Sequence, residues 1–197
     1  MSRIVVLYAT TDGQTGRIAR HVAAALSTEG VEAQVVDAAA PAPGFSLDGA
    51  DAAVVAGSIR MGRHQRALTR LVRSRAAELA RIPGAFLSVS LSAARATEPA
   101  RRDVRKCIAR FIEETGWTPD TILPVAGALL YSRYGFFLKR VMRFISRANG
   151  GDTDWSRDYE YTDWGRLTSF AQDFARAVQK RPDWQRELES LGSAPAA

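Results

Sequence analysis

A short polar turn near the start of the chain has the composition of an anion-binding site. The turn consists of Thr10, Thr11, Asp12, Gly13, Gln14 and Thr15. It lies between an apolar run, Ile4–Tyr8, and an amphipathic stretch that predicts a helix beginning near Gly16. The free N–H groups and the positive dipole end of a helix start attract anions, and three threonine hydroxyls can add donors. We therefore expect an anion to bind at this turn.

The residues that this turn lacks narrow the choice of ligand. A nucleoside triphosphate loop needs a Lys for the outer phosphates, and a dinucleotide fingerprint needs three spaced glycines. The turn has one Gly, three Thr and no Lys. Neutral donors of this kind suit a single phosphate monoester, such as that of flavin mononucleotide (FMN). The alternative is that Thr and Asp serve here only as caps of the helix.

Length, composition and charge restrict the class of protein. A chain of 197 residues with 46% hydrophobic residues can form one well-buried α/β domain. Its single cysteine, Cys107, excludes disulfides within the chain and zinc clusters, which fits a reducing compartment. The first strand begins too early for a secretion signal, and no apolar run reaches the ~18 residues of a membrane-spanning helix. We expect a cytoplasmic protein whose net charge of +6 favours an anionic partner.

Apolar runs that alternate with helical stretches predict the fold. The runs are Ile4–Tyr8, Val31–Val36, Ala52–Ala56, Ala85–Leu91 and Ile122–Leu130. This alternation predicts a five-stranded parallel sheet with helices on both faces. We expect residues 1–180 to form one domain and residues 181–197 to be a disordered tail.

Two further loops should lie beside the turn, because ligands of such sheets bind beyond the carboxyl ends of the strands. One loop follows the third strand and the other follows the fourth. We expect them to flank a planar ring through Ser58, Ile59 and Arg60 on one side and Ser90, Leu91, Ser92 and Ala93 on the other. Arg60 could place positive charge beside a reduced flavin or bind a substrate carboxylate, and it could equally be a solvated surface residue.

A long basic segment, residues 131–151, separates the fifth strand from the last helix. Its aromatic and aliphatic residues fall on one side at helical spacing, and Lys139, Arg140, Arg143 and Arg147 gather on another. Such a helix can lie in the interface of an anionic membrane, and we expect residues 131–148 to do so. The alternative is that its apolar face packs on the protein's own sheet or on a second subunit. Nucleic acid is not expected, because the aromatics share a face with aliphatic residues.

The chain returns to the sheet through a tight turn, Gly150–Asp154. We place Asp152 and Thr153 near the cofactor, and two carboxylates without a ligand-rich loop predict no metal site. The last helix should open at Tyr161–Trp164, with Thr162 or Asp163 as its N-cap.

Taken together, these segments resemble the flavodoxin-type protoporphyrinogen oxidases of bacteria, the menaquinone-dependent protoporphyrinogen IX dehydrogenase family. The resemblance spans most of the chain in order. The matching segments are Thr10–Thr15, Gly57–Gly62, Ala126–Leu129, the basic insert, Gly150–Asp154 and Tyr161–Trp164.

The resemblance implies a fold, a cofactor and a reaction. The fold would be a flavodoxin-like doubly wound sheet with strand order 2-1-3-4-5. The cofactor would be FMN, which would carry the redox chemistry without a catalytic side chain. The reaction would be oxidation of protoporphyrinogen IX to protoporphyrin IX in haem biosynthesis, with electrons passed to a quinone at the cytoplasmic face of the inner membrane.

Departures from the family pattern and two rival functions remain open. Met61 and Arg63–Gln65 stand where the family has aromatic and His-rich residues, so proton transfer by a histidine is not carried over to this chain. His64 could reach the mouth of the site, but we expect it to be an ordinary loop residue. A flavodoxin-like electron carrier is one alternative, although such carriers are usually acidic. A general quinone reductase is the other, although no dinucleotide fingerprint is present.

Overall fold

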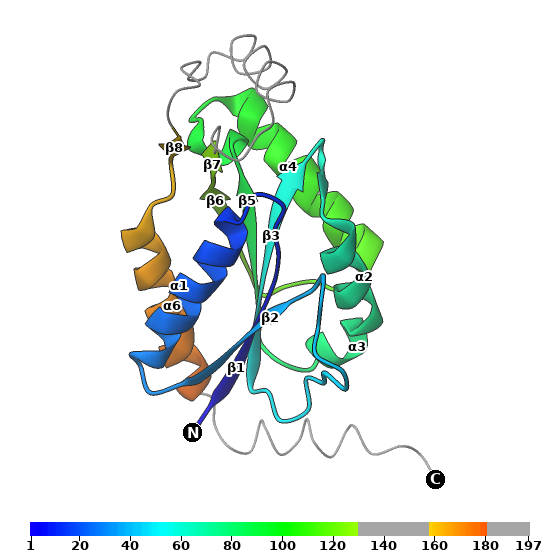
Figure 1. The fold of residues 1–197 in the computed structure, drawn as a ribbon, viewed down its shortest axis with the longest axis vertical. Helices are drawn as coiled ribbons and strands as arrows, with labels where there is room; N and C mark the ends of the chain where they lie inside the picture. The colour runs from blue at the N-terminus through cyan, green and yellow to red at the C-terminus, as the bar shows by residue number, and fades with distance from the viewer. Residues whose placement is uncertain (130–157, 181–197) are drawn as a thin grey trace.

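The centre of the fold is a parallel sheet, seen in a computed structural model that describes residues 1–129 and 158–180 (Figure 1). Its strands lie in the order β2-β1-β3-β5-β6, which confirms the predicted order of the five apolar runs. Leu7 of β1 is paired with Val36 of β2 and with Val55 of β3. The strands are β1 (Arg3–Ala9), β2 (Glu32–Asp37), β3 (Ala52–Arg60), β5 (Gly84–Ser90) and β6 (Thr121–Ala126).

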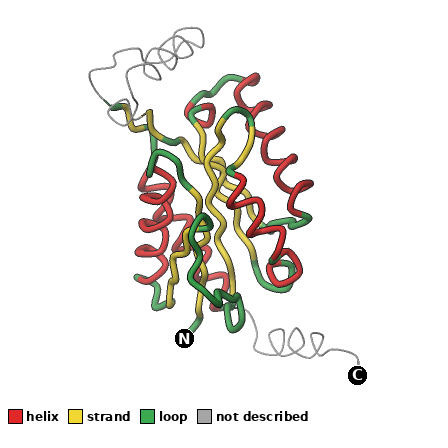
Figure 2. The backbone as a smooth tube through the Cα atoms, turned by 45° about the vertical axis from the view of Figure 1, so that its right-hand side comes forward, coloured by secondary structure: helices red, strands yellow, loops and turns green. Residues whose placement is uncertain are grey.

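Helices cover both faces of this sheet, as Figure 2 shows. One face is covered by α1 (Gln14–Ser27) and α6 (Trp164–Gln179). The other is covered by α2 (Arg66–Ser74), α3 (Ala76–Leu79) and α4 (Glu98–Thr115). The predicted three-layer α/β architecture is therefore confirmed.

Successive residues of the central strands pack into two separate cores. Val54 of β3 and Leu87 of β5 pack with α1 and α6, whereas Val55 and Phe86 pack with α2 and α4. Side chains alternate between the two faces of a strand, so a strand buried on both sides must be apolar throughout. All seven residues of β5 are buried. This burial fixes the carboxyl ends of the strands, where the predicted loops begin.

Two strand boundaries differ from those expected. The run after Ala56 was expected to be a loop, but β3 continues to Arg60 and forms a hairpin with β4 (Arg63–His64). The run Ile122–Leu130 was expected to be one strand, but β6 ends at Ala126. Beyond Gly127 the chain forms β7 (Ala128–Leu129), which pairs antiparallel with β8 (Tyr159–Glu160).

The start of the last helix is as expected. Asp163 is the N-cap of α6, and its Oδ1 accepts a hydrogen bond of 2.9 Å from the backbone N–H of Arg166. The basic insert at residues 131–151, with its predicted membrane segment 131–148, lies outside the described residues, as do Asp152, Thr153 and the tail at 181–197. Among the helices that the structure does describe, none is long and apolar enough to cross a bilayer.

Candidate functional site

The polar turn after β1 leaves the start of α1 open to a ligand. The helix begins at Gln14 rather than near Gly16, and its N-cap is Gly13 with φ 91°. No side chain caps the helix, so the capping role considered for Thr and Asp is not what the structure shows. The Gly13 N–H donates to Thr10 Oγ1 at 2.9 Å, which leaves the Thr10 hydroxyl proton free to donate outward. This geometry fits a phosphate.

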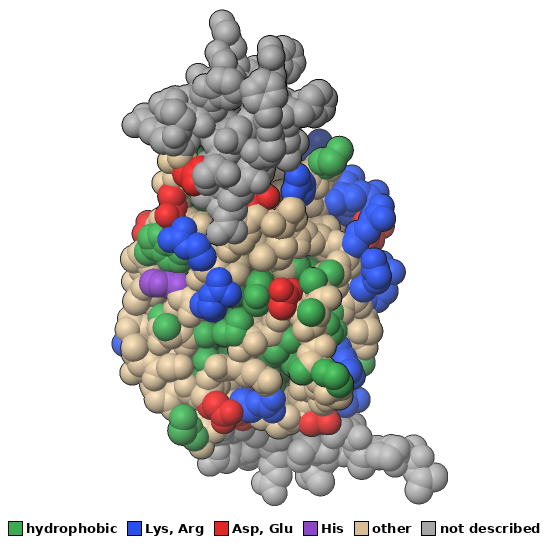
Figure 3. All heavy atoms as spheres, in the orientation of Figure 1, with side chains coloured by type: hydrophobic (Ala, Val, Ile, Leu, Met, Phe, Trp, Pro, Cys, Tyr) green, Lys and Arg blue, Asp and Glu red, His purple; other side chains and the backbone are tan. Residues whose placement is uncertain are grey.

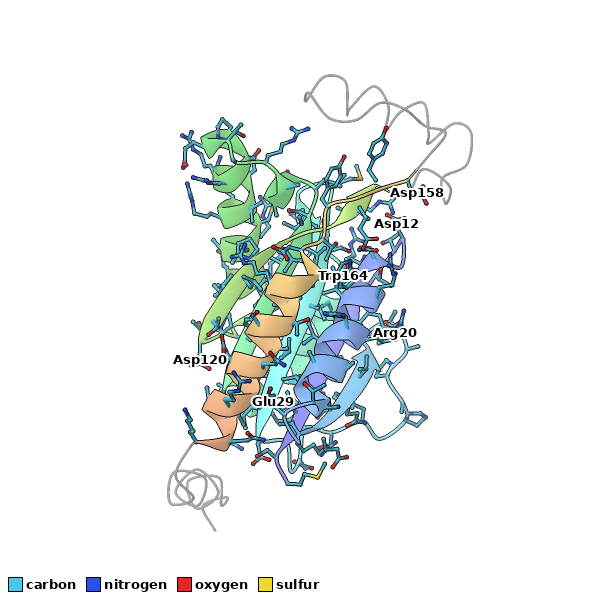
Figure 4. The ribbon with its side chains drawn as sticks, turned by 90° about the vertical axis from the view of Figure 1, so that its left-hand side faces the viewer. Asp12, Arg20, Glu29, Asp120, Asp158 and Trp164 are labelled. Carbon is cyan, nitrogen blue, oxygen red and sulfur yellow. The ribbon has the colours of Figure 1, made fainter. Side chains whose placement is uncertain are left out.

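Hydrogen bonds from Gln14 connect this turn to the segment just before α6. Its Nε2 donates to Glu160 Oε1 at 2.8 Å and to Thr162 Oγ1 at 2.9 Å. The Thr162 hydroxyl in turn donates to the Ala126 carbonyl at 2.9 Å. Because its side-chain amide is used inside the protein, Gln14 can offer a phosphate only its backbone N–H. Figure 4 shows Asp12 at the same end of the molecule as Asp158, and Glu29 and Asp120 near the other end.

A hairpin stands where sequence reasoning expected an irregular ring-binding loop. Met61 and Gly62 join β3 to β4 with φ angles of 50° and 75°, the pattern of a two-residue type I′ turn. Asn-Gly is the usual pair at such a turn, and a Met in this left-handed region is unusual. The Met61 side chain is 97% exposed at the tip. The tip of the hairpin is therefore exposed to solvent.

Hydrogen bonds connect the hairpin to the polar turn. Gln65 Nε2 donates to Ser58 Oγ and to Thr11 Oγ1, each at 2.8 Å. Arg60 Nη1 lies 3.8 Å from Asp12 Oδ1. Arg60 is therefore a solvent-exposed residue that lies within ion-pair distance of the polar turn. The predicted groups Thr10–Thr15 and Ser58–Arg60 are brought together at one edge.

The segment after β5 forms the third part of the candidate site, beside the polar turn and the hairpin. Ser90 Oγ accepts a hydrogen bond of 3.1 Å from the Ala93 N–H, and Ser92–Ala94 forms a short 3-10 helix. The Gly127 N–H donates to the Ser90 carbonyl at 3.1 Å, which joins this segment to the end of β6. Leu91 lies half-buried between Ser90 and this helix.

A cleft of about 350 Å³ opens between the hairpin and this segment. The predicted contacts Ile59, Ser90 and Ser92 line it together with Gly62. Its other wall comes from α4 and consists of Asp103, Val104, Lys106, Cys107 and Arg110. Sequence reasoning missed this wall, although the spacing of 103, 106, 107 and 110 is that of one helix face.

His64 belongs to β4 and its side chain lies in the core, so the expectation of an ordinary loop residue was wrong. It is 7% exposed, and its ring centroid is 5.0 Å from those of both Phe86 and Phe111. Its Nε2 is 3.1 Å from Ser88 Oγ. Burial lowers the pKa of His64 to about 4, with a smaller opposing contribution from the backbone of Cys107. The imidazole is therefore neutral at pH 7 and anchors the hairpin.

The hairpin tip is also held from α4. Cys107 Sγ donates to the Gly62 carbonyl at 3.3 Å, and Arg110 Nη1 donates to the same oxygen at 3.2 Å. Burial raises the pKa of the Cys107 thiol, which keeps it neutral. Within residues 1–129 and 158–180, no group of three or more His, Cys, Asp and Glu side chains is placed to hold a metal ion.

Comparison with known proteins agrees with this geometry. The flavodoxin domain family model matches residues 5–156. A protoporphyrinogen IX dehydrogenase [quinone] of Escherichia coli K12 is 32% identical over 179 residues, which are 90% of this chain and 97% of the relative. One of the same name from Leishmania major is 34% identical over 184 residues, 91% of this chain and 79% of the relative. The chain belongs to the flavodoxin-type protoporphyrinogen IX dehydrogenase family.

Family membership makes the protein a flavin-binding oxidoreductase with a flavodoxin-like fold. A short-chain flavodoxin associated with a bacterial microcompartment superposes with a TM-score of 0.54 at 15% identity, covering 90% of this chain and 99% of that one. This likeness supports the fold alone. The relatives named protoporphyrinogen IX dehydrogenase [quinone] match over 90% and 91% of this chain.

Proposed function

We propose that this protein binds FMN and oxidises protoporphyrinogen IX to protoporphyrin IX in haem biosynthesis, with a membrane quinone as electron acceptor. The observation that carries the proposal is the near-complete match to relatives named for this reaction, 97% of the length of the E. coli protein. The uncapped start of α1, together with the segments Ser58–Arg60 and Ser90–Ala93 at the same edge of the sheet, supports the proposal because a flavin nucleotide requires a phosphate site beside a ring site.

The residues of the site divide into those for the phosphate and those for the ring. The backbone N–H groups of Gln14 and Thr15 and the hydroxyls of Thr10 and Thr11 would hold the phosphate. Ser58, Ile59 and the Ser90–Ala93 segment would hold the ring system. When bound, FMN supplies a two-electron redox centre that can react with both the porphyrinogen and the quinone. The protein's own groups bind, orient and shield, and no nucleophile or catalytic triad is required.

Arg60 has an electrostatic role in this proposal. Its guanidinium lies beside Asp12 at the end of β3, between the turn and the hairpin. A fixed cation there favours negative charge on a neighbouring flavin or substrate. Since the ion pair is partly exposed, its effect on affinity should be modest.

The basic insert would place the flavin edge against the membrane. In the sequence, residues 131–148 follow β7 (Ala128–Leu129), which lies beyond the carboxyl end of β6, at the end of the sheet that carries the site. Cations on such a segment are attracted to anionic lipid at ~1 kcal/mol each. Replacing Lys139, Arg140, Arg143 and Arg147 with Gln should weaken binding to anionic liposomes. Unchanged partitioning would exclude this membrane role.

A coupled assay tests the proposed reaction. FMN-loaded protein supplied with protoporphyrinogen IX and a menaquinone analogue should produce fluorescent protoporphyrin without oxygen. Protein freed of FMN serves as the control and should be inactive until FMN is restored. Reduction of the flavin by unrelated donors without porphyrin formation would instead indicate an electron carrier or a general quinone reductase.

A further inference from the structure

The cleft beside the hairpin has a second wall that the flavin does not explain. Ile59, Gly62, Ser90 and Ser92 belong to the segments proposed to flank the ring. The opposite wall lies on α4, and it combines an apolar residue, Val104, with two cations, Lys106 and Arg110. The phosphate has its own neutral site at the start of α1. These two cations therefore line a space that is open to a second anionic group.

The charges of the α4 wall are available to a ligand. Lys106 is exposed and forms no ion pair within the described part of the chain. Arg110 uses one N–H on the Gly62 carbonyl, and a guanidinium has five. Asp103 is the one acidic residue among those that line the cleft, so the lining has a net positive charge. Figure 3 shows Lys and Arg side chains gathered on this side of the molecule.

The apolar part of the cleft adjoins these cations. Val104 is 4% exposed, and Ile59 faces the cleft from the end of β3. Binding clefts for organic ligands combine apolar walls with a few placed polar groups, usually in volumes of ~300 to 1,000 Å³. At about 350 Å³ this cleft suits one edge of a macrocycle.

We propose that this cleft binds a propionate-bearing edge of the tetrapyrrole substrate, with its carboxylate held by Lys106 and Arg110. The inference rests on the proposed function, because it assigns part of that substrate to a place. The ring edge packs on Ile59 and Val104, next to the segments that flank the flavin. Arg110 and Cys107 hold the hairpin tip, so the cleft exists before the ligand arrives.

The direct test is the binding of protoporphyrin to the FMN-loaded protein, followed by porphyrin fluorescence. Lys106→Gln should weaken binding by ~3 to 10-fold, the range for one partly exposed charge-assisted contact. Lys106→Arg should retain the affinity. The matched control is Arg70→Gln on α2, which removes an exposed cation that does not line the cleft and should leave affinity unchanged.

The dimethyl ester of protoporphyrin isolates the carboxylate. With this neutral ligand, the wild-type protein and the Lys106→Gln variant should bind equally. In turnover, Lys106→Gln should raise the KM for the porphyrinogen without changing kcat or the KM for the quinone. This split separates carboxylate binding from a general effect on the flavin.

Three results would overturn the inference. The first is that Arg70→Gln weakens protoporphyrin binding as much as Lys106→Gln does, which would indicate a general effect of surface charge. The second is that Lys106→Gln weakens binding of the dimethyl ester as much as binding of protoporphyrin. The third is that Lys106→Gln shifts the flavin reduction potential and leaves the affinity for protoporphyrin unchanged. The binding measurement needs no turnover. If protoporphyrin binding depends on Lys106 but the protein does not oxidise protoporphyrinogen, the proposed function is refuted and the proposed carboxylate site is supported.

Discussion

The two halves of the candidate site are built in different ways. The phosphate half is a turn between β1 and α1, made of consecutive residues with neutral donors. The ring half, where the flavin ring and the edge of the substrate would lie, is assembled from a hairpin, a 3-10 helix and a face of α4, with Arg60, Lys106 and Arg110 around it. The first is a contiguous turn with Gly13 in a left-handed conformation, and one side chain, Gln14, joins it to Glu160 and Thr162. The second needs several distant segments to pack correctly.

This difference indicates where stability and specificity reside. The turn proposed to bind the phosphate would suit any nucleotide monophosphate, because its geometry is that of a helix start. The ring half carries the features particular to this chain, above all a hairpin anchored by a buried His64. Changes in the ring half should therefore alter stability and substrate choice, whereas changes in the turn should alter cofactor affinity.

The largest expected effect comes from the anchor of the hairpin. The pKa of His64 falls to about 4 in the folded protein from an ordinary value of 6.5. Below pH 6.5 the unfolded chain takes up a proton that the folded protein refuses, so stability falls as the pH drops from about 6.5 to about 4. The loss is at most ~3 kcal/mol and levels off below pH 4. Urea unfolding at several pH values measures it.

His64→Leu provides the comparison, because it removes the titrating group from the same place. Other carboxylates titrate in both proteins, so the difference between their pH profiles isolates His64. Parallel profiles between pH 7 and pH 4 would show that the hairpin anchor does not titrate as described.

A second effect on stability is expected at the base of the hairpin, where Gly57 is closely packed. A Cβ at Gly57 would be 2.6 Å from Leu68 Cδ2 and 3.2 Å from His64 Cδ2. Gly57→Ala should cost ~1 to 3 kcal/mol of unfolding free energy through overpacking. Gly165→Ala is the control, since its added Cβ meets Asp163 Oδ1 at 3.5 Å, an ordinary contact. Equal stabilities of the two variants would contradict the packing described for the hairpin.

Removing the Gln14 side chain, which holds the polar turn, should have a smaller effect on stability and a larger effect on FMN affinity. Gln14→Ala removes the amide that joins Glu160 and Thr162, which should cost ~1 to 2 kcal/mol. FMN should bind ~5 to 20-fold more weakly because the turn is less well held. Quenching of flavin fluorescence measures this. Gln34→Ala, which removes a surface acceptor of Arg3, should leave FMN affinity unaltered.

The smallest expected effect is a gain. Met61 has φ 50° at an exposed turn, a conformation that costs a non-glycine residue ~1 kcal/mol. Met61→Gly should relieve this strain and raise the thermal midpoint by a few degrees at most, because the greater freedom of glycine in the unfolded chain offsets part of the gain. A clear loss of stability would mean that the Met61 side chain makes contacts that its 97% exposure excludes.

The strands could be predicted from contiguous apolar runs, and their order followed from the resemblance to flavodoxin-like proteins. The turn Thr10–Thr15 lies between β1 and α1 as expected, and its role as a phosphate site stays a prediction. The hairpin was missed because Met61-Gly62 is not a usual type I′ pair, and a non-glycine residue at positive φ cannot be recognised from composition. The buried place of His64 was missed because it depends on Phe86 and Phe111, which are distant in the chain. The α4 wall was missed because the apolar stripe of this helix predicts which of its residues are buried, but not which of its polar residues line a cleft.

The most direct test of the central claim is a single-turnover measurement without quinone or oxygen. FMN-loaded protein mixed with protoporphyrinogen IX should lose its visible flavin absorbance as porphyrin fluorescence appears, and added menaquinone should restore the flavin band. A flavin that stays oxidised in the presence of excess porphyrinogen would contradict the account.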